Sequence, residues 1–123
     1  MNEYLKGKIK SALNSWENDL RYLVNRKDIL VIHFGIQKVF DGYEISLTGH
    51  TWFDNNDLWL LGEEWSPSIK YISLGHDSLN FERQLVLNTL EILLQDKLIK
   101  CSIIHNSVIV TVGFVDGNYK RLQ

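Results

Sequence analysis

Cysteine and proline are almost absent from this chain, which has one cysteine, Cys101, and one proline, Pro67, among 123 residues. A lone cysteine can form neither an intramolecular disulfide nor a four-cysteine zinc site, and this favours a reducing compartment. With one proline and eight glycines, the chain lacks the composition of a disordered linker. Its length predicts a single domain over residues 1–123 that buries one core.

Long apolar runs are missing as well. No stretch approaches the ~18–20 apolar residues that cross a bilayer. The charged beginning, residues 1–10, lacks the apolar segment of a signal peptide. A content of 45% hydrophobic and 23% charged residues is typical of a soluble globular protein. We therefore expect a cytoplasmic protein that does not bind membranes.

Basic residues are scarce in the middle of the chain. Residues 41–91 carry only Lys70 and Arg83 against nine acidic residues, a net charge of −7. Residues 1–40 carry +3, from seven basic and four acidic residues, and residues 92–123 carry +2. A negative centre argues against direct binding of nucleic acid there and favours a basic ligand.

Residues 51–67 (TWFDNNDLWLLGEEWSP) contain no lysine, arginine or histidine, but three of the four tryptophans. Aromatic surface beside carboxylates is typical of an interface that binds a basic protein. The alternative is a segment that anchors the core and has solvated carboxylates, because aromatic residues are usually buried. We expect both, with some tryptophans buried and an acidic rim exposed. The candidate partner-binding residues are Asp54, Asp57, Trp59, Glu63, Glu64 and Trp65, with Asp41 and Glu44 extending the rim.

Hydrophobic periodicity predicts the order helix, strands, helix, strands. Steps of three and four residues predict amphipathic helices over residues 2–26 and 79–100. Alternation predicts strands over residues 29–40 and 43–52, joined by an Asp41-Gly42 hairpin turn. Further strands are expected at residues 58–61, 69–74, 102–104, 107–114 and 119–122. This order favours an α+β fold, an antiparallel sheet of about five or six strands with the N-terminal helix and the second long helix packed on it.

Catalytic signatures are weak. Cys101 and His105 would lie about 13 Å apart along an extended strand, although a turn would let them meet. A free cysteine is usually an inert core residue. Neither a G-x-S-x-G elbow nor a phosphate-binding loop is present. We therefore predict no catalytic residues and no cofactor, and a binding protein rather than an enzyme.

The four histidines lack the H-x-x-x-H and H-x-H spacings that place two metal ligands on one face. His33 lies within an apolar strand, and we expect it to be a hydrogen-bonded core residue. The best metal alternative is a small metal-dependent hydrolase or nuclease, whose ligands would be His50, Asp54, Asp57 and His76.

Two blocks of sequence carry a resemblance to a known group of proteins. The first is W-F-D-x-x-D-x-W at residues 52–59, followed by E-x-x-S-P-S at residues 63–68 and an Ile/Tyr-rich strand. The second is VGFVDGN at residues 112–118. Together they resemble small bacterial immunity proteins, the antitoxins of polymorphic toxins and of contact-dependent growth-inhibition toxins. The resemblance implies a non-enzymatic cytoplasmic protein whose partner is the C-terminal domain of a cognate secreted toxin, in many cases a basic nuclease.

A further alternative is a ligand-binding or scaffold domain. It would show an apolar pocket lined by Trp52, Phe53 and Trp59. The immunity hypothesis predicts instead an open, acidic surface.

Overall fold

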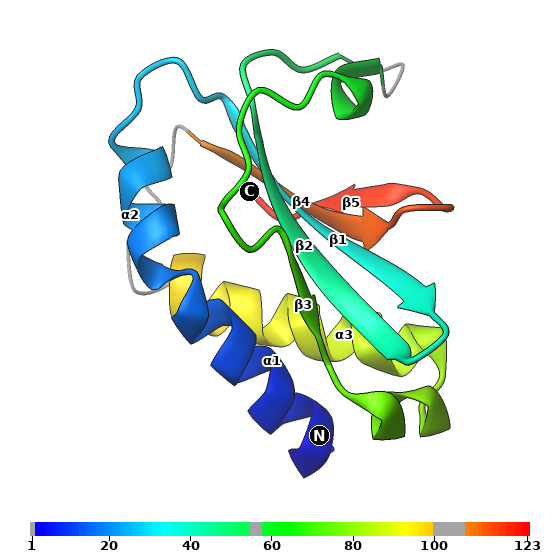
Figure 1. The fold of residues 1–123 in the computed structure, drawn as a ribbon. Coiled ribbons are helices and arrows are strands. Elements are labelled where there is room, and N and C mark those ends of the chain that lie inside the picture. The colour runs from blue at the N-terminus through cyan, green and yellow to red at the C-terminus, as the bar shows by residue number, and fades with distance from the viewer. Residues whose placement is uncertain (1, 55–57, 100–107) are drawn as a thin grey trace.

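The computed structural model describes residues 2–54, 58–99 and 108–123 (Figure 1). α1 and α2 are followed by a hairpin, two 3-10 helices around a short strand, a long helix that ends in a π-helical turn, and a second hairpin. The elements are α1 (Glu3–Ser15), α2 (Glu17–Val24), β1 (Val31–Val39), β2 (Gly42–His50), η1 (Leu58–Leu61), β3 (Tyr71–Ser73), η2 (His76–Asn80), α3 (Arg83–Leu94), η3 (Gln95–Ile99), β4 (Ile109–Phe114) and β5 (Tyr119–Arg121).

The five strands form one sheet in the order β3-β2-β1-β4-β5. Three of the four pairings are antiparallel, and the central pair, β1 with β4, is parallel. A parallel pair needs a crossover connection, and α3 lies within the segment that connects β3 to β4. The α+β class is confirmed, with a mixed sheet in place of a wholly antiparallel one. The strand expected at residues 102–104 lies outside the described residues.

Strands β1 and β2 form the predicted hairpin. Val39 pairs with Gly42, so the turn consists of Phe40 and Asp41. Gly42 has φ +127°, a conformation that side chains rarely adopt. A Cβ at Gly42 would also lie 2.2 Å from the Gly75 carbonyl oxygen. Glycine is therefore required here for two independent reasons.

One face of the sheet carries the core. Phe34 pairs with Leu47 and Ile36 with Ile45, and all four side chains are fully buried. Figure 1 shows α1, α2 and α3 on this side of the sheet. The buried residues of these helices that join the core are Leu5, Ile9, Ala12, Leu13, Leu20, Leu23, Val86, Leu90, Leu93 and Leu94.

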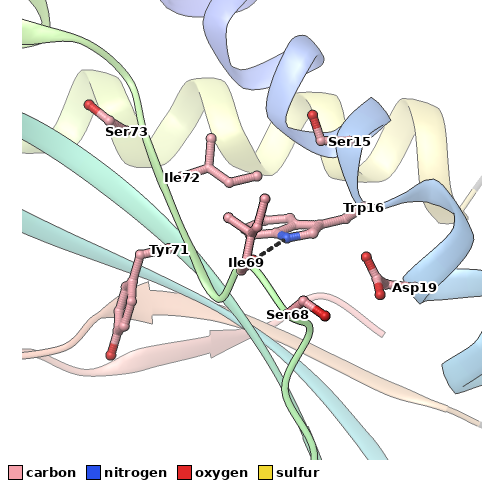
Figure 2. A pocket seen from close by; sticks show the side chains of 8 residues that line it. All are labelled: Ser15, Trp16, Asp19, Ser68, Ile69, Tyr71, Ile72 and Ser73. Atoms are coloured by element: carbon pink, nitrogen blue, oxygen red, sulfur yellow. Dashed lines mark hydrogen bonds between the residues drawn. The ribbon is translucent and has the colours of Figure 1, made fainter.

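The single helix expected over residues 2–26 is two helices in the structure. They meet at Trp16, whose backbone leaves the helical region at φ −94° and ψ 5°. The Trp16 indole N–H donates to the Ile69 carbonyl at 2.8 Å, and its side chain is buried (Figure 2). Because the ring contacts a segment 53 residues away, its effect is invisible to helical periodicity.

The second helix begins later than expected. Residues 76–80 form η2, Phe81 is extended, and α3 starts at Arg83. Ser78 is buried beneath the hairpin. Its Oγ accepts the Tyr43 N–H at 2.8 Å and donates to the Gly75 carbonyl at 2.6 Å.

Among the described residues, no helix combines the length and apolar character that crossing a membrane requires.

Candidate functional site

The face of the sheet opposite the helices is polar. Because side chains alternate between the two faces of a strand, the residues that lie between core positions in the sequence point to this face. His33 pairs with Thr48 and Gly35 with Ser46 across β1 and β2. The polar or small residues on this face of the three central strands are His33, Gly35, Gln37, Glu44, Ser46, Thr48, His50, Thr111 and Gly113. We call it the open face.

Trp59 attaches η1 to one end of the open face. Its ring is fully buried and meets His50 edge-on, with centroids 5.0 Å apart. The rings of Phe53, Tyr119 and His33 also surround it, at 5.3, 5.2 and 5.7 Å. Leu58–Leu61 is a 3-10 helix rather than the expected strand, and this turn places Trp59 inward. Trp59 therefore contacts its own sheet and is not available as an exposed anchor for a partner.

The other two tryptophans of residues 51–67 lie differently. Trp52 is exposed over 41% of its surface, and its indole nitrogen would lie 3.0 Å from a Cβ at Gly62. Trp65 is half-buried and packs against Tyr22, with ring centroids 6.0 Å apart. The mixed expectation for the tryptophans, some buried and some exposed, is confirmed.

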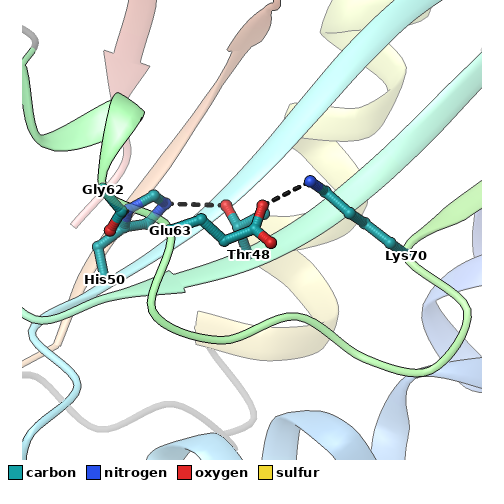
Figure 3. Close-up of polar contacts among 5 residues, drawn as sticks. All are labelled: Thr48, His50, Gly62, Glu63 and Lys70. Carbon is teal, nitrogen blue, oxygen red and sulfur yellow. Dashed lines mark hydrogen bonds and ion pairs between the residues drawn. The ribbon is translucent and has the colours of Figure 1, made fainter.

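His50 is held in one tautomer by its partners. The Gly62 carbonyl, 3.2 Å from Nδ1, can only accept, so Nδ1 carries the proton. Nε2 then accepts the Thr48 hydroxyl at 2.9 Å (Figure 3). Burial lowers the pKa of His50 below its ordinary value, opposed by the Gly62 carbonyl. The ring is therefore neutral near pH 7, and its hydrogen bond links the end of β2 to Gly62.

His33 is neutral as well. Its Nδ1 lies 2.8 Å from the Thr111 hydroxyl, so the expected hydrogen bond is present. The expected core position is wrong, because His33 is half-buried on the face of the sheet opposite the core. Burial, followed by the proximity of His50, lowers the pKa of His33 to about 3. A group with so low a pKa is a weak general base at neutral pH, since proton transfer is most effective when the pKa lies near the working pH.

A cleft of about 230 Å³ opens beside η1 on the open face. Its floor includes His33, Ser46 and Thr48, and a Cβ at Gly35 would lie 2.6 Å from the Ser46 oxygen. The absence of a side chain at Gly35 therefore leaves room for Ser46. Glu63 and Lys70, which form an ion pair, also line the cleft. Its mostly apolar rim consists of Leu60, Leu61, Tyr71, Phe114, Val115, Gly117 and Tyr119.

Glu63 does not present a free charge. Its carboxylate forms an ion pair with the ammonium group of Lys70, and each side chain is about one-third exposed (Figure 3). That hydrogen bond raises the pKa of Lys70. Glu64, by contrast, is exposed and forms no salt bridge among the residues that the structure describes. The acidic rim is thus partly neutralised by this chain's own lysine.

The remaining candidate acids are not gathered in one place. Asp54 is half-buried and has interactions of its own, and Asp57 lies outside the described residues. Asp41 is exposed in the hairpin turn, and Glu44 accepts a hydrogen bond from Gln37 at 3.2 Å. Both belong to the end of β2 opposite His50. The structure does not bring them together with Glu63 and Glu64.

The proposed metal ligands are also separated. His76 follows Gly75, which contacts Gly42 at the start of β2, whereas His50 ends that strand. Eight residues of strand correspond to about 26 Å. No group of three or more metal-ligating side chains occurs among the described residues. Cys101 and His105 lie outside them.

The cleft contains residues that are not among the candidate partner-binding residues predicted from the sequence. Ser46, Thr48 and Lys70 are ordinary strand or loop residues, and only the alternation of β2 marks the first two as facing away from the core. The ligand-binding alternative predicts an apolar pocket lined by Trp52, Phe53 and Trp59, but the rings of Phe53 and Trp59 instead pack against each other with centroids 5.3 Å apart.

Comparisons with protein-family models, with curated proteins and with solved structures found no significant match to this chain.

Proposed function

We propose that this chain is a cytoplasmic immunity-type protein that binds the C-terminal domain of a cognate secreted toxin and neutralises it. The binding surface is the η1 surface, which we define as Trp52, Leu58, Leu61, Glu63 and Glu64. The proposal rests on the exposure of Leu61. This side chain is 84% exposed on a fixed turn, beside the carboxylates of Glu63 and Glu64.

Exposed apolar side chains gather on the η1 surface. Leu58 is 52% exposed and belongs to the same short helix as Leu61. Trp52 is 41% exposed. Single exposed apolar residues are common, but a group of them beside charges is typical of a protein-binding site. Apolar side chains supply the buried contact, and the flanking acids orient a basic partner.

The η1 surface is also pre-organised. Trp59 packs into the aromatic group below it, and the Gly62 carbonyl accepts the His50 N–H. A surface held in place before binding loses little conformational entropy on association. This supports a dedicated binding role.

The η1 surface carries less unpaired negative charge than the acidic rim expected from the sequence. Glu64 is the exposed acid, whereas Glu63 already binds Lys70. A basic partner would therefore meet the unpaired carboxylate of Glu64 and would compete with Lys70 for the carboxylate of Glu63. We attribute most of the affinity to the apolar contact and assign the charges to orientation and association rate.

Catalysis is less well supported than binding. The cleft's most chemically active side chain, His33, is a weak base because its pKa is about 3. His50 is committed on both ring nitrogens to Thr48 and Gly62.

The test is growth rescue. Bacteria that produce the C-terminal domain of a secreted protein encoded beside this chain are expected to survive only when they also produce the chain. Leu61→Arg should abolish rescue, whereas Phe40→Arg, at a residue 91% exposed in the hairpin turn, should preserve it. Rescue by the Leu61→Arg variant would contradict the assigned surface, and failure of the wild-type chain to rescue would contradict the function.

A further inference from the structure

Strand β3 forms one edge of the sheet, and two of its three residues direct their backbone groups outward. Ile45 pairs with Ile72, Leu47 N–H donates to the Lys70 carbonyl, and Leu74 N–H donates to the Tyr43 carbonyl. In an antiparallel ladder these positions alternate with residues whose N–H and C=O face away from the partner strand. Those residues are Tyr71 and Ser73, and neither backbone has another partner among the described residues.

A groove of about 470 Å³ runs along this edge (Figure 2). Ser15, Trp16 and Asp19 form its helical wall, and the other wall consists of Ser68, Ile69, Tyr71, Ile72 and Ser73. The hydrogen bond from the Trp16 indole to the Ile69 carbonyl fixes the two walls relative to each other. The Ile69 side chain is 66% exposed, so apolar surface accompanies the outward backbone groups.

The opposite edge of the sheet is protected differently. Strand β5 carries Lys120 and Arg121, and charged residues on an edge strand discourage pairing with another chain. Strand β3 consists of Tyr71, Ile72 and Ser73 and carries no charge. Its only protection is its shortness. Of the two edges, β3 is therefore the one able to accept another strand.

We infer that an extended segment of the partner protein pairs with β3 as an additional strand, and that a lysine or arginine of this segment contacts Asp19. The inference rests on the proposed function, because it assumes a protein partner. Backbone hydrogen bonds to Tyr71 and Ser73 hold the segment, Ile69 supplies apolar contact, and Asp19 selects a basic residue. Among the described residues that line the groove, Asp19 is the only one with a charged side chain, so the groove is complementary to a cation.

A second copy of this chain fits the groove less well. Its own β3 has three uncharged residues, and the neighbouring Lys70 is paired with Glu63. Such a copy would offer Asp19 no basic partner. Two three-residue strands would also bury far less than the ~1,200 Å² that stable protein interfaces need.

The test uses a phage-displayed library of random linear peptides, about twelve residues long, selected on the folded wild-type chain. Ser73→Pro removes an outward N–H from the strand and also fixes φ at this residue. Ser73→Ala is its matched control, since both variants lose the hydroxyl that accepts the Gly75 N–H. We expect the selected peptides to contain a basic residue. Their affinity should fall at least about tenfold in Ser73→Pro and in Asp19→Lys, and should be retained in Ser73→Ala. If Ser73→Pro does not fold, Tyr71→Pro with Tyr71→Ala replaces the pair.

The inference is overturned if no peptide is selected, or if the selected peptides bind Ser73→Pro and Ser73→Ala equally well. It is also overturned if light scattering shows a wild-type dimer that Ser73→Pro converts to a monomer, because a second copy would then be the occupant. Growth rescue separates this inference from the proposed function. Rescue by both the wild-type chain and Ser73→Pro would leave the neutralising role intact and remove the added strand.

Discussion

The ring of Trp59 stands perpendicular to that of His50, with an interplanar angle of 89° and centroids 5.0 Å apart. This contact joins the 3-10 helix η1 to the end of β2, and the cleft opens beside it. Trp59 is therefore the residue that fixes η1 against the sheet. Its indole N–H has no hydrogen-bond partner among the residues that the structure describes, so we attribute its stabilising effect to packing.

Replacing Trp59 with alanine should destabilise the fold strongly. A fully buried tryptophan leaves a large cavity, and the expected loss in free energy of unfolding is about 3–5 kcal/mol. Trp52→Ala is the matched control, with an expected loss below about 1 kcal/mol because that ring is substantially exposed. Urea denaturation followed by circular dichroism measures both. Equal losses would show that Trp59 does not anchor η1.

Two glycine-to-alanine changes should act in opposite directions. At Gly42, φ is +127° and a Cβ would lie 2.2 Å from the Gly75 carbonyl oxygen, so alanine should cost more than about 2 kcal/mol. At Gly7, in α1, nothing lies within 4 Å of a Cβ, and alanine should stabilise by about 0.5–1 kcal/mol. Thermal unfolding of both variants gives the comparison. A tolerated alanine at Gly42 would contradict the hairpin geometry.

Stability should fall as the pH drops below about 6.5, because His33, which is half-buried, and His50, which is buried, both resist protonation. His33 keeps its neutral form in the folded chain down to a pKa of about 3, against an ordinary value of 6.5. Between these values the unfolded chain binds more protons, so stability is present above pH 6.5 and is lost toward pH 3, by at most ~1.4 kcal/mol per pH unit for each such group. The pKa of His50 is lowered in the same direction.

The measurement for this pH effect is urea denaturation at pH 7 and pH 5, a range in which few carboxylates become protonated. His33→Asn removes the titrating ring and retains a polar group able to reach the Thr111 hydroxyl. The variant should show a smaller difference in stability between the two pH values than the wild-type chain. An unchanged difference would mean that His33 does not contribute.

Charge reversal at Glu64 tests the acidic part of the η1 surface. Glu64→Lys should slow association with the toxin domain several-fold at low salt and leave the melting temperature nearly unchanged, because an exposed charge mainly steers encounter. Asp77→Lys, on the exposed surface of η2, is the matched control and should have little effect. Stopped-flow binding at two ionic strengths measures the rates. An identical rate for Glu64→Lys would remove the steering role.

Charge reversal at Glu63 is a different experiment. Because Glu63 pairs with Lys70, Glu63→Lys would break an ion pair and place two ammonium groups together. Its effect on binding would mix the loss of a partner contact with a local rearrangement. Glu64→Lys therefore gives the result that is easier to interpret, because Glu64 lacks the ion pair that Glu63 forms with Lys70.

The features that the sequence predicted well have local causes. The hairpin predicted from Asp41-Gly42 follows from glycine's access to positive φ, although the two turn residues are Phe40 and Asp41. The alternation from residue 43 onward follows from the two-residue period of a strand. The apolar stripe of α1 follows from the helical repeat. Each feature depends on residues within a few positions of one another, so the local sequence contains the information.

What the tertiary structure alone decided involves residues far apart in the chain. The helix breaks at Trp16 because its indole bonds to Ile69, and β1 lies parallel to β4 because the segment containing α3 crosses between them. The fates of Trp59, buried, and Trp52, exposed, depend on which rings surround them after folding. Composition determined that the middle of the chain would be aromatic and acidic. Only long-range packing could determine which of those side chains meet solvent, because burial is a property of the assembled sheet and not of the segment.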